Sequence, residues 1–346
     1  MAKILFGVCG VGYGHAVRSK ILLDYLTKKN NVMVIAGLVA YDYLKANFKN
    51  VNRVDSLEFA FKDNKVLTLN TVLKNIGKIS KKNYYSLKRL KTKIDHFAPE
   101  VIISDFEPFS IYYGKDRKLK ILGFDNEHYL IEGKLDVPEK YKIEFLKNRF
   151  VVSFYKTDEL ALLILPGQKL NKESKAKTLM PIIRNSILKA KSKKGNNILV
   201  YTSIIKNPGM FEVLKKFNEK FIIFGYDRDY EEDNLIFRRF NDKKFDEELA
   251  NCKAVITTAG INLISEAIYL GKPLLLVPIK NQFEQTLNAL YVKNNKYGEF
   301  FEDLTHDNLK YFLNNLNNYK YEKYTPGNKE LILIIEDFIK RNKNAN

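Results

Sequence analysis

Short runs of apolar, often β-branched residues recur along the chain, and segments with helical spacing of apolar residues separate them. Such near-continuous runs are typical of strands in a parallel sheet that helices cover on both faces. The alternation therefore predicts a doubly wound α/β architecture. Strands are expected over residues 3–8, 32–37, 101–104, 120–124, 161–165, 198–201, 221–224, 235–237, 254–257 and 273–277.

The alternation pauses over residues 166–196, which are mostly polar and charged. A chain of 346 residues is long enough for about two domains. We therefore expect one Rossmann-like domain over residues 1–180, a linker over 181–196 and a second Rossmann-like domain over 197–325. A C-terminal helix within residues 326–346 is expected to pack back on the first domain.

Basic side chains outnumber acidic ones, 58 against 40, which gives a net charge of +18. Residues 62–93 hold ten basic residues and one acid, together with apolar residues at nearly helical spacing. Such a segment favours an anionic membrane surface, a lipid or lipid-phosphate substrate, or nucleic acid. For the total charge, a compositional bias toward Lys, Asn and Ile is the alternative explanation. For the segment 62–93, the alternative is a solvated helix packed on its own core. Nucleic acid is disfavoured because the sequence has no recognition-helix motif and no aromatic-and-basic sheet pattern.

The sequence contains no run of 18 apolar residues, and its start lacks the long apolar core of a signal peptide. Cys9 and Cys252 provide neither a disulfide framework nor metal-ligand spacing. We therefore expect a cytoplasmic protein, with peripheral attachment to the inner face of the membrane if the basic segment binds lipid.

A glycine-rich loop follows the first strand, with Gly12 and Gly14 just before His15. The third glycine of a dinucleotide-binding fingerprint would fall where His15 stands, and the Lys-Ser/Thr ending of a P-loop is absent. No cofactor is expected. An imidazole at this junction of loop and helix is suited to acid–base chemistry near neutral pH. A capping or surface histidine is the alternative interpretation.

Asp105 ends an apolar strand and should project from the same sheet edge as His15. A carboxylate beside an imidazole fixes its tautomer and raises its basicity. In the alternative interpretation, Asp105 only caps the next helix.

A third group of candidate residues lies in residues 254–277, whose pattern predicts a strand, a turn, a helix, a second turn and a second strand. Gly260 leaves room for a phosphate at the start of the helix. Glu266, one turn into that helix, has two acceptor oxygens that suit a ribose diol. Glu284 and Gln285 follow the next strand and could bind sugar hydroxyls.

Taken together, these motifs resemble those of GT-B-type glycosyltransferases. The similarity is greatest to the glucuronosyltransferase-like group and to the N-acetylglucosaminyl transferases of peptidoglycan-precursor synthesis. The motifs that carry it are Gly12-Tyr13-Gly14-His15, Ala259-Gly260-Ile261-Asn262 with Glu266-Ala267, Gly271-Lys272-Pro273 with Pro278, and Glu284-Gln285-Thr286-Leu287-Asn288-Ala289.

The resemblance implies two Rossmann-like doubly wound domains facing a central cleft. It also implies transfer of a sugar from a nucleotide diphosphate donor, a UDP-sugar above all, to a hydroxyl acceptor with inversion. His15 would be the base, Asp105 would orient it, and Gly12 and Gly14 would form the acceptor-side loop. The residues implied on the donor side are Thr202 and Ser203 in a phosphate loop, Phe240 near the base ring, Thr258, Gly260 and Asn262 at the pyrophosphate, Glu266 at the ribose, and Glu284 and Gln285 at the sugar.

Two positions depart from the pattern of the group. Thr258 stands where many relatives have a histidine, and the loop around Thr202 is poor in glycine. Asp227-Arg228-Asp229 spells the metal signature of another glycosyltransferase fold, but it lies in an acidic loop. No metal is expected, because helix dipoles and backbone amides can neutralise a leaving diphosphate.

Three other functions remain open. A nucleotide-sugar epimerase or hydrolase could use the same half-sites without an acceptor. A basic nucleic-acid-binding protein would account for the charge. A catalytically silent partner subunit would bind the donor without turnover.

Overall fold

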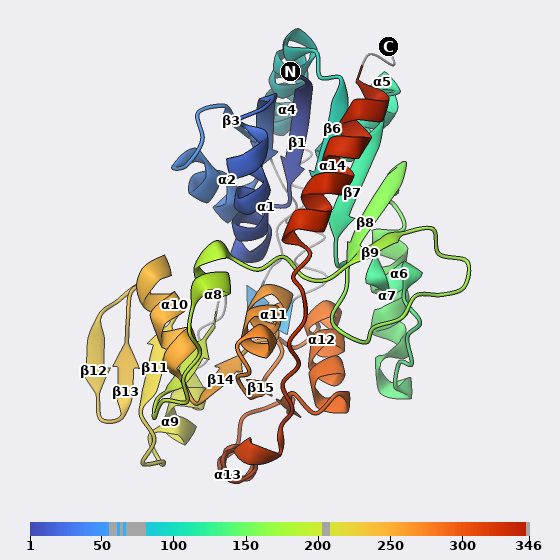
Figure 1. Cartoon of the computed structure of the whole chain (residues 1–346). Helices are drawn as coiled ribbons and strands as arrows, with labels where there is room; N and C mark the ends of the chain where they lie inside the picture. Colours follow the sequence, from blue (N-terminus) through green and yellow to red (C-terminus); the bar gives the residue numbers. More distant parts are fainter. Residues whose placement is uncertain (55–60, 63–64, 67–80, 203–207, 344–346) are drawn as a thin grey trace. The chain divides into compact units, whose positions relative to one another are not determined.

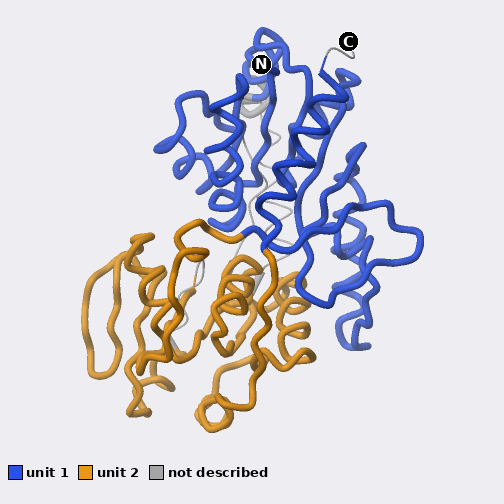
Figure 2. Tube along the Cα trace, viewed as in Figure 1, with its two compact units in different colours: residues 1–60, 68–182, 326–346 blue, residues 61–67, 183–325 orange. Residues whose placement is uncertain are grey.

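The computed structural model describes residues 1–54, 61–62, 65–66, 81–202 and 208–343. The chain divides into two compact units, shown in Figure 2. Unit 1 comprises residues 1–60, 68–182 and 326–346, and unit 2 comprises residues 61–67 and 183–325. The C-terminal segment therefore belongs to the same unit as the N-terminus.

Unit 1 is built on a seven-stranded sheet of order β3-β2-β1-β6-β7-β8-β9, in which every pair is parallel. The order of the strands reverses beside β1, and ligands of open α/β sheets bind at such a switch point, outside the carboxyl ends of the strands. The strands are β1 (Lys3–Val8), β2 (Asn31–Ala36), β3 (Val51–Arg53), β6 (Val101–Asp105), β7 (Ile121–Asp125), β8 (Glu159–Leu163) and β9 (Lys177–Leu179).

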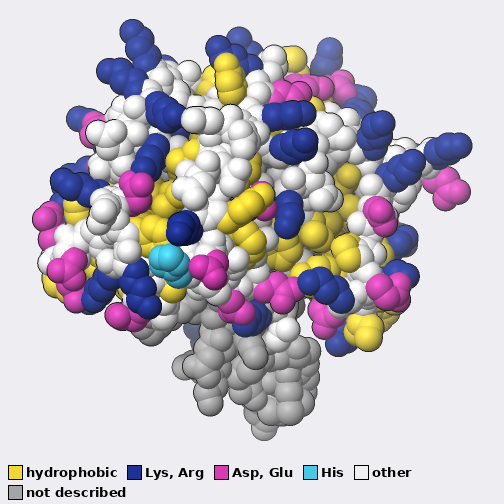
Figure 3. All heavy atoms as spheres, turned by 90° about the horizontal axis from the view of Figure 1, so that it is seen from below, with side chains coloured by type: hydrophobic (Ala, Val, Ile, Leu, Met, Phe, Trp, Pro, Cys, Tyr) yellow, Lys and Arg dark blue, Asp and Glu magenta, His cyan; other side chains and the backbone are white. Residues whose placement is uncertain are grey.

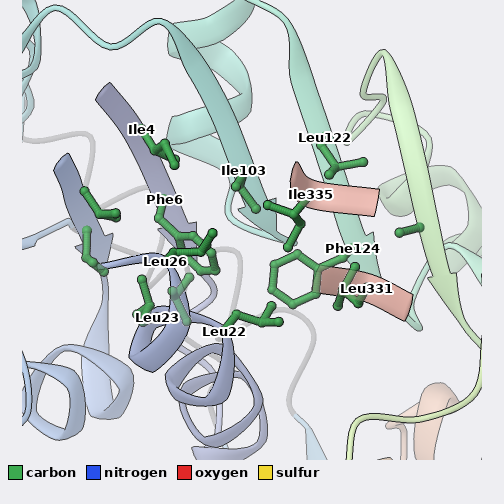
Figure 4. Close-up of a cluster of buried hydrophobic side chains, with 14 of the residues drawn as sticks. Ile4, Phe6, Leu22, Leu23, Leu26, Ile103, Leu122, Phe124, Leu331 and Ile335 are labelled. Atoms are coloured by element: carbon green, nitrogen blue, oxygen red, sulfur yellow. The ribbon is translucent and has the colours of Figure 1, made fainter. Parts of the chain in front are cut away.

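Helices cover both faces of this sheet (Figure 1). The helices of unit 1 are α1 (Tyr13–Leu26), α2 (Leu38–Lys45), α4 (Lys81–Phe97), α5 (Pro108–Arg117), α6 (Tyr129–Glu132), α7 (Lys142–Val152) and α14 (Asn328–Asn342). Figure 4 shows side chains of α1 and α14 meeting those of β1, β6 and β7 in one buried cluster. A second cluster on the other face joins Leu5 of β1 to Leu90 and Ile94 of α4 and Ile111 of α5.

Unit 2 has a seven-stranded sheet of order β12-β13-β11-β10-β14-β15-β16. Strand β12 is antiparallel to β13, and the other pairs are parallel. The strands are β10 (Ile198–Tyr201), β11 (Phe221–Phe224), β12 (Tyr230–Glu232), β13 (Leu235–Phe237), β14 (Ala254–Thr257), β15 (Leu274–Leu276) and β16 (Gly298–Phe300).

The helices of unit 2 are α8 (Asn185–Lys189), α9 (Pro208–Leu214), α10 (Asp242–Asn251), α11 (Ile261–Tyr269), α12 (Phe283–Asn294) and α13 (His306–Asn314). Strands β4 (Phe61–Lys62) and β5 (Lys65–Val66) form a separate antiparallel pair. Among the described helices, none combines the length and the hydropathy that a membrane span requires.

The predicted alternation of strands and helices is confirmed in both units, and each of the ten expected strands is present. The pause in the alternation over residues 166–196 is not free of regular structure, since it contains the edge strand β9 and, within the predicted linker 181–196, the helix α8. Residues 181 and 182 belong to unit 1. Two of the three residues of β9 are exposed, so this strand has no apolar run that would have marked it.

Candidate functional site

The glycine loop after β1 leads directly into α1. Gly12 is the N-cap residue of this helix and has φ of 76°, in the left-handed region that favours glycine. No atom of the described residues lies within 4 Å of a Cβ built on Gly12, so backbone conformation and not crowding requires glycine. Gly14 and His15 lie in the first turn of α1. The imidazole is thereby placed at the carboxyl edge of the unit 1 sheet.

His15 and Asp105 lie together at this edge. In the register of β1 and β6, Val8 pairs with Asp105, so the end of β6 lies beside the start of the glycine loop. Nδ1 of His15 is 2.8 Å from Oδ1 of Asp105, whose side chain is fully buried. The helix after β6 is capped by Glu107, which accepts from the backbone N–H groups of Phe109 and Ser110. Asp105 is therefore not the helix cap that the alternative interpretation made it.

Arg18, which sequence reasoning missed, also binds Asp105. Its Nε donates to Oδ2 of Asp105 at 2.9 Å and to Oδ1 at 3.1 Å, and its Nη1 donates to Asn126 at 2.6 Å. Ser19 Oγ donates to Oδ2 at 2.9 Å. Arg18 is 3 % exposed, because α1 turns this side chain toward the carboxylate and not toward solvent. The available signal was its spacing of three residues from His15, which places both on one helix face.

The ionisation of Asp105 follows from these contacts. Burial alone raises the pKa of its carboxyl, but the Arg18 guanidinium and the His15 imidazole outweigh burial and lower the pKa to about 2. The carboxylate is therefore ionised at neutral pH. Nη2 of Arg18 lies 2.9 Å from His15 Nδ1. A guanidinium can only donate, so a protonated Nδ1 donates to Asp105 and makes no hydrogen bond with Arg18.

Glu127 faces the other ring nitrogen of His15. Its Oε1 is 3.3 Å from Nε2, and its Oε2 is 3.6 Å from Nη2 of Arg18. Burial lowers the pKa of His15, as does Arg18, but Cys9, Asp105 and Glu127 together raise it well above its ordinary value. The imidazole thus has a carboxylate at each nitrogen and holds a proton strongly. Glu127 was not among the predicted site residues.

A second imidazole and carboxylate pair follows β7. Nδ1 of His128 is 2.8 Å from Oδ2 of Asp125, and both side chains are buried. Burial lowers the pKa of His128, but Asp125 raises it to a net increase. The ring of His128 meets Phe106 edge-on at 5.8 Å, and Phe106 stacks on Tyr155 at 4.2 Å. The signal for this pair was an Asp and a His three residues apart at the end of a predicted strand.

In unit 2, Thr258, Gly260 and Asn262 lie between β14 and the first turn of α11. Gly260 has φ of −68°, and the left-handed residue of this turn is Ala259, with φ of 71°. The amide of Asn288 donates to the carbonyl of Ala259 at 3.1 Å and supports the turn. No atom of the described residues lies within 4 Å of a Cβ built on Gly260. Open space is therefore what Gly260 provides at the start of α11.

Glu266 is buried and ion-paired with Arg184. Nε and Nη2 of Arg184 donate to its two carboxylate oxygens at 2.7 and 2.6 Å. Nη1 of Arg184 is 2.5 Å from Oδ1 of Asp246. Arg184 lies in the stretch interpreted as linker, and sequence reasoning did not pair it with Glu266.

The other predicted donor residues are placed separately. Gln285 is buried, and its Oε1 accepts from the backbone N–H of Ile279 at 3.0 Å, while Glu284 is half-buried. Thr202 is buried at the end of β10, and its Oγ1 has no hydrogen-bond partner among the described residues. Phe240 is 46 % exposed and packs against Phe245 at 5.4 Å.

Two predictions concern residues that the structure does not describe. Ser203 lies in the stretch 203–207, and half of the basic segment 62–93 lies in residues 63–64 and 67–80. In the acidic loop, Asp229 accepts from the backbone N–H of Arg239 at 3.2 Å. Within the described part of the chain, no group of three His, Cys, Asp or Glu side chains is arranged to hold a metal ion.

Comparisons with known proteins match nearly the whole chain. A family model described as "Glycosyl transferase family 1" matches residues 2–317. No curated protein sequence matches the chain.

Several solved structures are similar. The calicheamicin glycosyltransferase CalG4 has a TM-score of 0.68 at 14% identity and covers 100% of both chains. MurG of Acinetobacter baumannii has a TM-score of 0.62 at 13% identity, covering 97% of this chain and 100% of its own. A UDP-glucosyltransferase from Polygonum tinctorium capable of glucosylating indoxyl has a TM-score of 0.62 at 12% identity, covering 99% of this chain and 94% of its own.

Proposed function

The chain belongs to glycosyl transferase family 1 and has the GT-B fold of two Rossmann-like domains, and from this premise we propose that it transfers a hexose from a UDP-sugar to a hydroxyl acceptor with inversion. The observation that carries the proposal is the pairing of His15 with a buried, ionised Asp105 at the switch point of the unit 1 sheet. This geometry suits a base that takes the proton of an acceptor hydroxyl.

In the proposed reaction, the reactive form of His15 is the neutral imidazole, which predominates above its raised pKa. Its Nδ1–H donates to Asp105, which leaves Nε2 as the proton acceptor. The acceptor hydroxyl gives its proton to Nε2 while its oxygen attacks the anomeric carbon of the donor. The leaving nucleotide diphosphate departs from the opposite face of that carbon, so its configuration is inverted. The imidazolium that forms lies between Asp105 and Glu127, and both carboxylates stabilise it.

Unit 2 is proposed to hold the donor. The open space at Gly260 and the N-terminus of α11 suit a diphosphate, because backbone N–H groups and the helix dipole favour negative charge there. Oγ1 of Thr202, which has no hydrogen-bond partner within the described ranges, suits a phosphate oxygen. Arg184 orients Glu266, and each carboxylate oxygen retains a further lone pair for a ribose hydroxyl. Phe240, Thr258, Asn262, Glu284 and Gln285 would complete the donor site.

The proposed acceptor is a lipid or a lipid phosphate, reached by a protein that attaches peripherally to the inner face of the membrane. The excess of basic side chains supports this proposal. Gly12 and Gly14 would line the acceptor side of the site.

The first test is a thermal-shift panel of UDP, GDP, dTDP and CMP, because a ligand that binds only the folded state raises its melting temperature. The sugar nucleotide chosen in this way is then assayed for transfer. His15→Ala should reduce turnover by about 100-fold or more and leave the nucleotide-induced shift intact. His96→Ala, at an exposed histidine of the same unit, is the matched control and should retain full turnover.

Two outcomes would reject the proposal. Undiminished turnover in His15→Ala would exclude the proposed base. Conversion of the donor alone into an epimer or free sugar, at a rate equal to that of transfer to an acceptor, would favour an epimerase or hydrolase.

A further inference from the structure

Helix α7 carries apolar side chains on the face that it turns to solvent. Ile143, Leu146 and Phe150 are spaced by three and four residues, so they lie on one face of the helix. Their exposed fractions are 65, 61 and 66%. Val152, the buried residue of α7, lies on the opposite side. The exposed face is therefore not the face by which α7 packs on unit 1.

The apolar surface continues past the end of the helix. Phe154 is 63% exposed, and its ring meets that of Phe150 edge-on at 4.9 Å. Val151 is 50% exposed. Single exposed apolar residues are ordinary, but a contiguous group of this kind marks an interaction surface. We refer to Ile143, Leu146, Phe150, Val151 and Phe154 as the α7 apolar face.

Cationic side chains flank the α7 apolar face along one side, and Glu144 lies at its other edge, by its spacing of seven residues from Val151. Residues 139–156 contain five basic and two acidic residues. Lys142 and Arg149 lie along one side of it, and Lys147 lies within it, by their spacing on the helix. Figure 3 shows Lys and Arg side chains spread widely over one face of the molecule, with Asp and Glu side chains among them.

We propose that the α7 apolar face docks on an anionic lipid bilayer. An amphipathic helix with aromatic and aliphatic residues between Lys and Arg inserts its apolar side at the level of the lipid headgroups. The flanking cations then pair with anionic headgroups, and the net charge of +18 adds attraction. A second copy of the chain is a poorer occupant, because two such faces would bring like charges together.

The same helix leads to the candidate catalytic cluster. Tyr155 follows the α7 apolar face and stacks on Phe106, with rings 4.2 Å apart and 11° between their planes. Phe106 is next to Asp105, and its ring meets His128. A bilayer bound at α7 would therefore lie beside the end of unit 1 that holds His15. If the proposed function is correct, the acceptor is carried by that bilayer.

The chain contains no tryptophan, which makes a direct measurement feasible. Phe150→Trp introduces a single fluorophore within the α7 apolar face of the full-length protein. On adding vesicles of phosphatidylglycerol and phosphatidylcholine, its emission should move to shorter wavelength and be quenched by brominated lipid. Tyr112→Trp, at a residue that is 60% exposed on α5, should show neither change. An unshifted emission from Phe150→Trp would overturn the proposal.

Vesicle sedimentation separates apolar insertion from general charge attraction. Replacing Ile143, Leu146 and Phe150 together by Ser should weaken binding to the anionic vesicles by at least about 100-fold. The matched control replaces three exposed apolar residues elsewhere, Tyr112, Tyr311 and Leu333, by Ser and should bind as the unaltered protein does. Equal binding by both triple variants would overturn the proposal.

The charge component has its own pair of variants. Lys142, Lys147 and Arg149 changed together to Gln should weaken binding at low salt more than the same change at the exposed Lys172, Lys175 and Lys191. Equal losses would mean that only the total charge matters and would contradict docking at α7. If the unaltered protein dimerises through this face and does not bind vesicles, the occupant of the face is a second copy of the chain and the proposal is wrong. None of these measurements requires a donor, so their failure leaves the transferase proposal to its own assay.

Discussion

Asp105 accepts hydrogen bonds from Arg18 and Ser19 and lies within hydrogen-bond distance of His15, with no exposure to water. The ionised carboxylate is compatible with burial because Arg18 supplies the compensating charge and His15 and Ser19 occupy further lone pairs. Removing Arg18 would leave the buried carboxylate of Asp105 without its compensating charge. The candidate base is therefore supported by groups that also hold the fold together.

Arg18→Met should destabilise unit 1 by about 3–5 kcal/mol, because it leaves Asp105 buried without its counter-charge. Arg117→Met is the matched control and should cost less than about 1 kcal/mol, since Arg117 pairs with Asp95 on the surface. Urea unfolding measures both. The pKa of Asp105, lowered from 3.8 to about 2, means that the ion pair stabilises the fold above pH 3.8. The difference in unfolding free energy between the unaltered protein and Arg18→Met should therefore decrease as the pH falls toward 2. Equal losses for the two variants would contradict this account.

Glu127→Gln should change the pH dependence of transfer. Activity requires neutral His15, so kcat/KM falls as the pH drops below the pKa of His15. Glu127 is one of the groups that raise this pKa, so removing its charge should lower the pKa and move the acid limb to lower pH. Glu132→Gln, which removes a carboxylate from α6, should leave the limb in place. An unmoved limb in Glu127→Gln would mean that Glu127 does not act on the base.

At the scale of elements, α14 illustrates how the last residues of the chain complete a core begun by the first. Leu331, Ile335 and Phe338 are fully buried against the face of the unit 1 sheet that α1 also covers (Figure 4). In α1 the buried positions are Ala16, Arg18, Ser19, Leu22, Leu23 and Leu26. Polar residues are among them because the end of this helix nearest the glycine loop faces Asp105, not apolar side chains.

Phe338→Ala should cost about 3–5 kcal/mol of unfolding free energy, because it leaves a cavity between α14 and the sheet. Leu333→Ala changes the same helix at a residue that is 64% exposed and should cost less than about 0.5 kcal/mol. The midpoints of denaturant unfolding measure the difference, provided that the slope of unfolding free energy against denaturant concentration is the same for both variants. Similar midpoints for the two variants would show that α14 does not contribute the packing described.

At the scale of the whole molecule, the chain has two seven-stranded sheets, each with its own core and each in its own compact unit. Calorimetry should therefore resolve two unfolding transitions. UDP at about 100 times its dissociation constant adds ~2.7 kcal/mol to the unit that binds it. That addition raises one melting temperature by about 5–10 °C for a unit of this size. Phe338→Ala should lower only the other transition. A single transition that moves in both experiments would show that the two units unfold together.

Local patterns in the sequence were sufficient to predict the fold class, ten of the strands and the position of the candidate base. Apolar runs located the ten long or buried strands, because a strand covered on both faces needs such a run wherever it lies in the sheet. The strands β3, β9, β12 and β16 were missed, because at most one of the three residues of each is buried and none contains a buried apolar run. The two-residue strands β4 and β5 were missed as well. The glycine loop, His15 and Asp105 were identified because each follows directly from a predicted strand end.

The meeting of His15 with Asp105 was predicted, but the tertiary structure alone decided which other side chains join the two candidate sites. Arg18 and Asp105 are 87 residues apart, and Arg184 and Glu266 are 82 apart. Such pairs depend on strand order and register, as when Val8 of β1 is placed beside Asp105 of β6. The same holds for Glu127 at the second nitrogen of His15. Residue types and their spacing along the chain reflect the periodicity of helices and strands, which is local. The ion-pair partner of a charged side chain depends instead on which distant segments the fold brings together at one edge of a sheet.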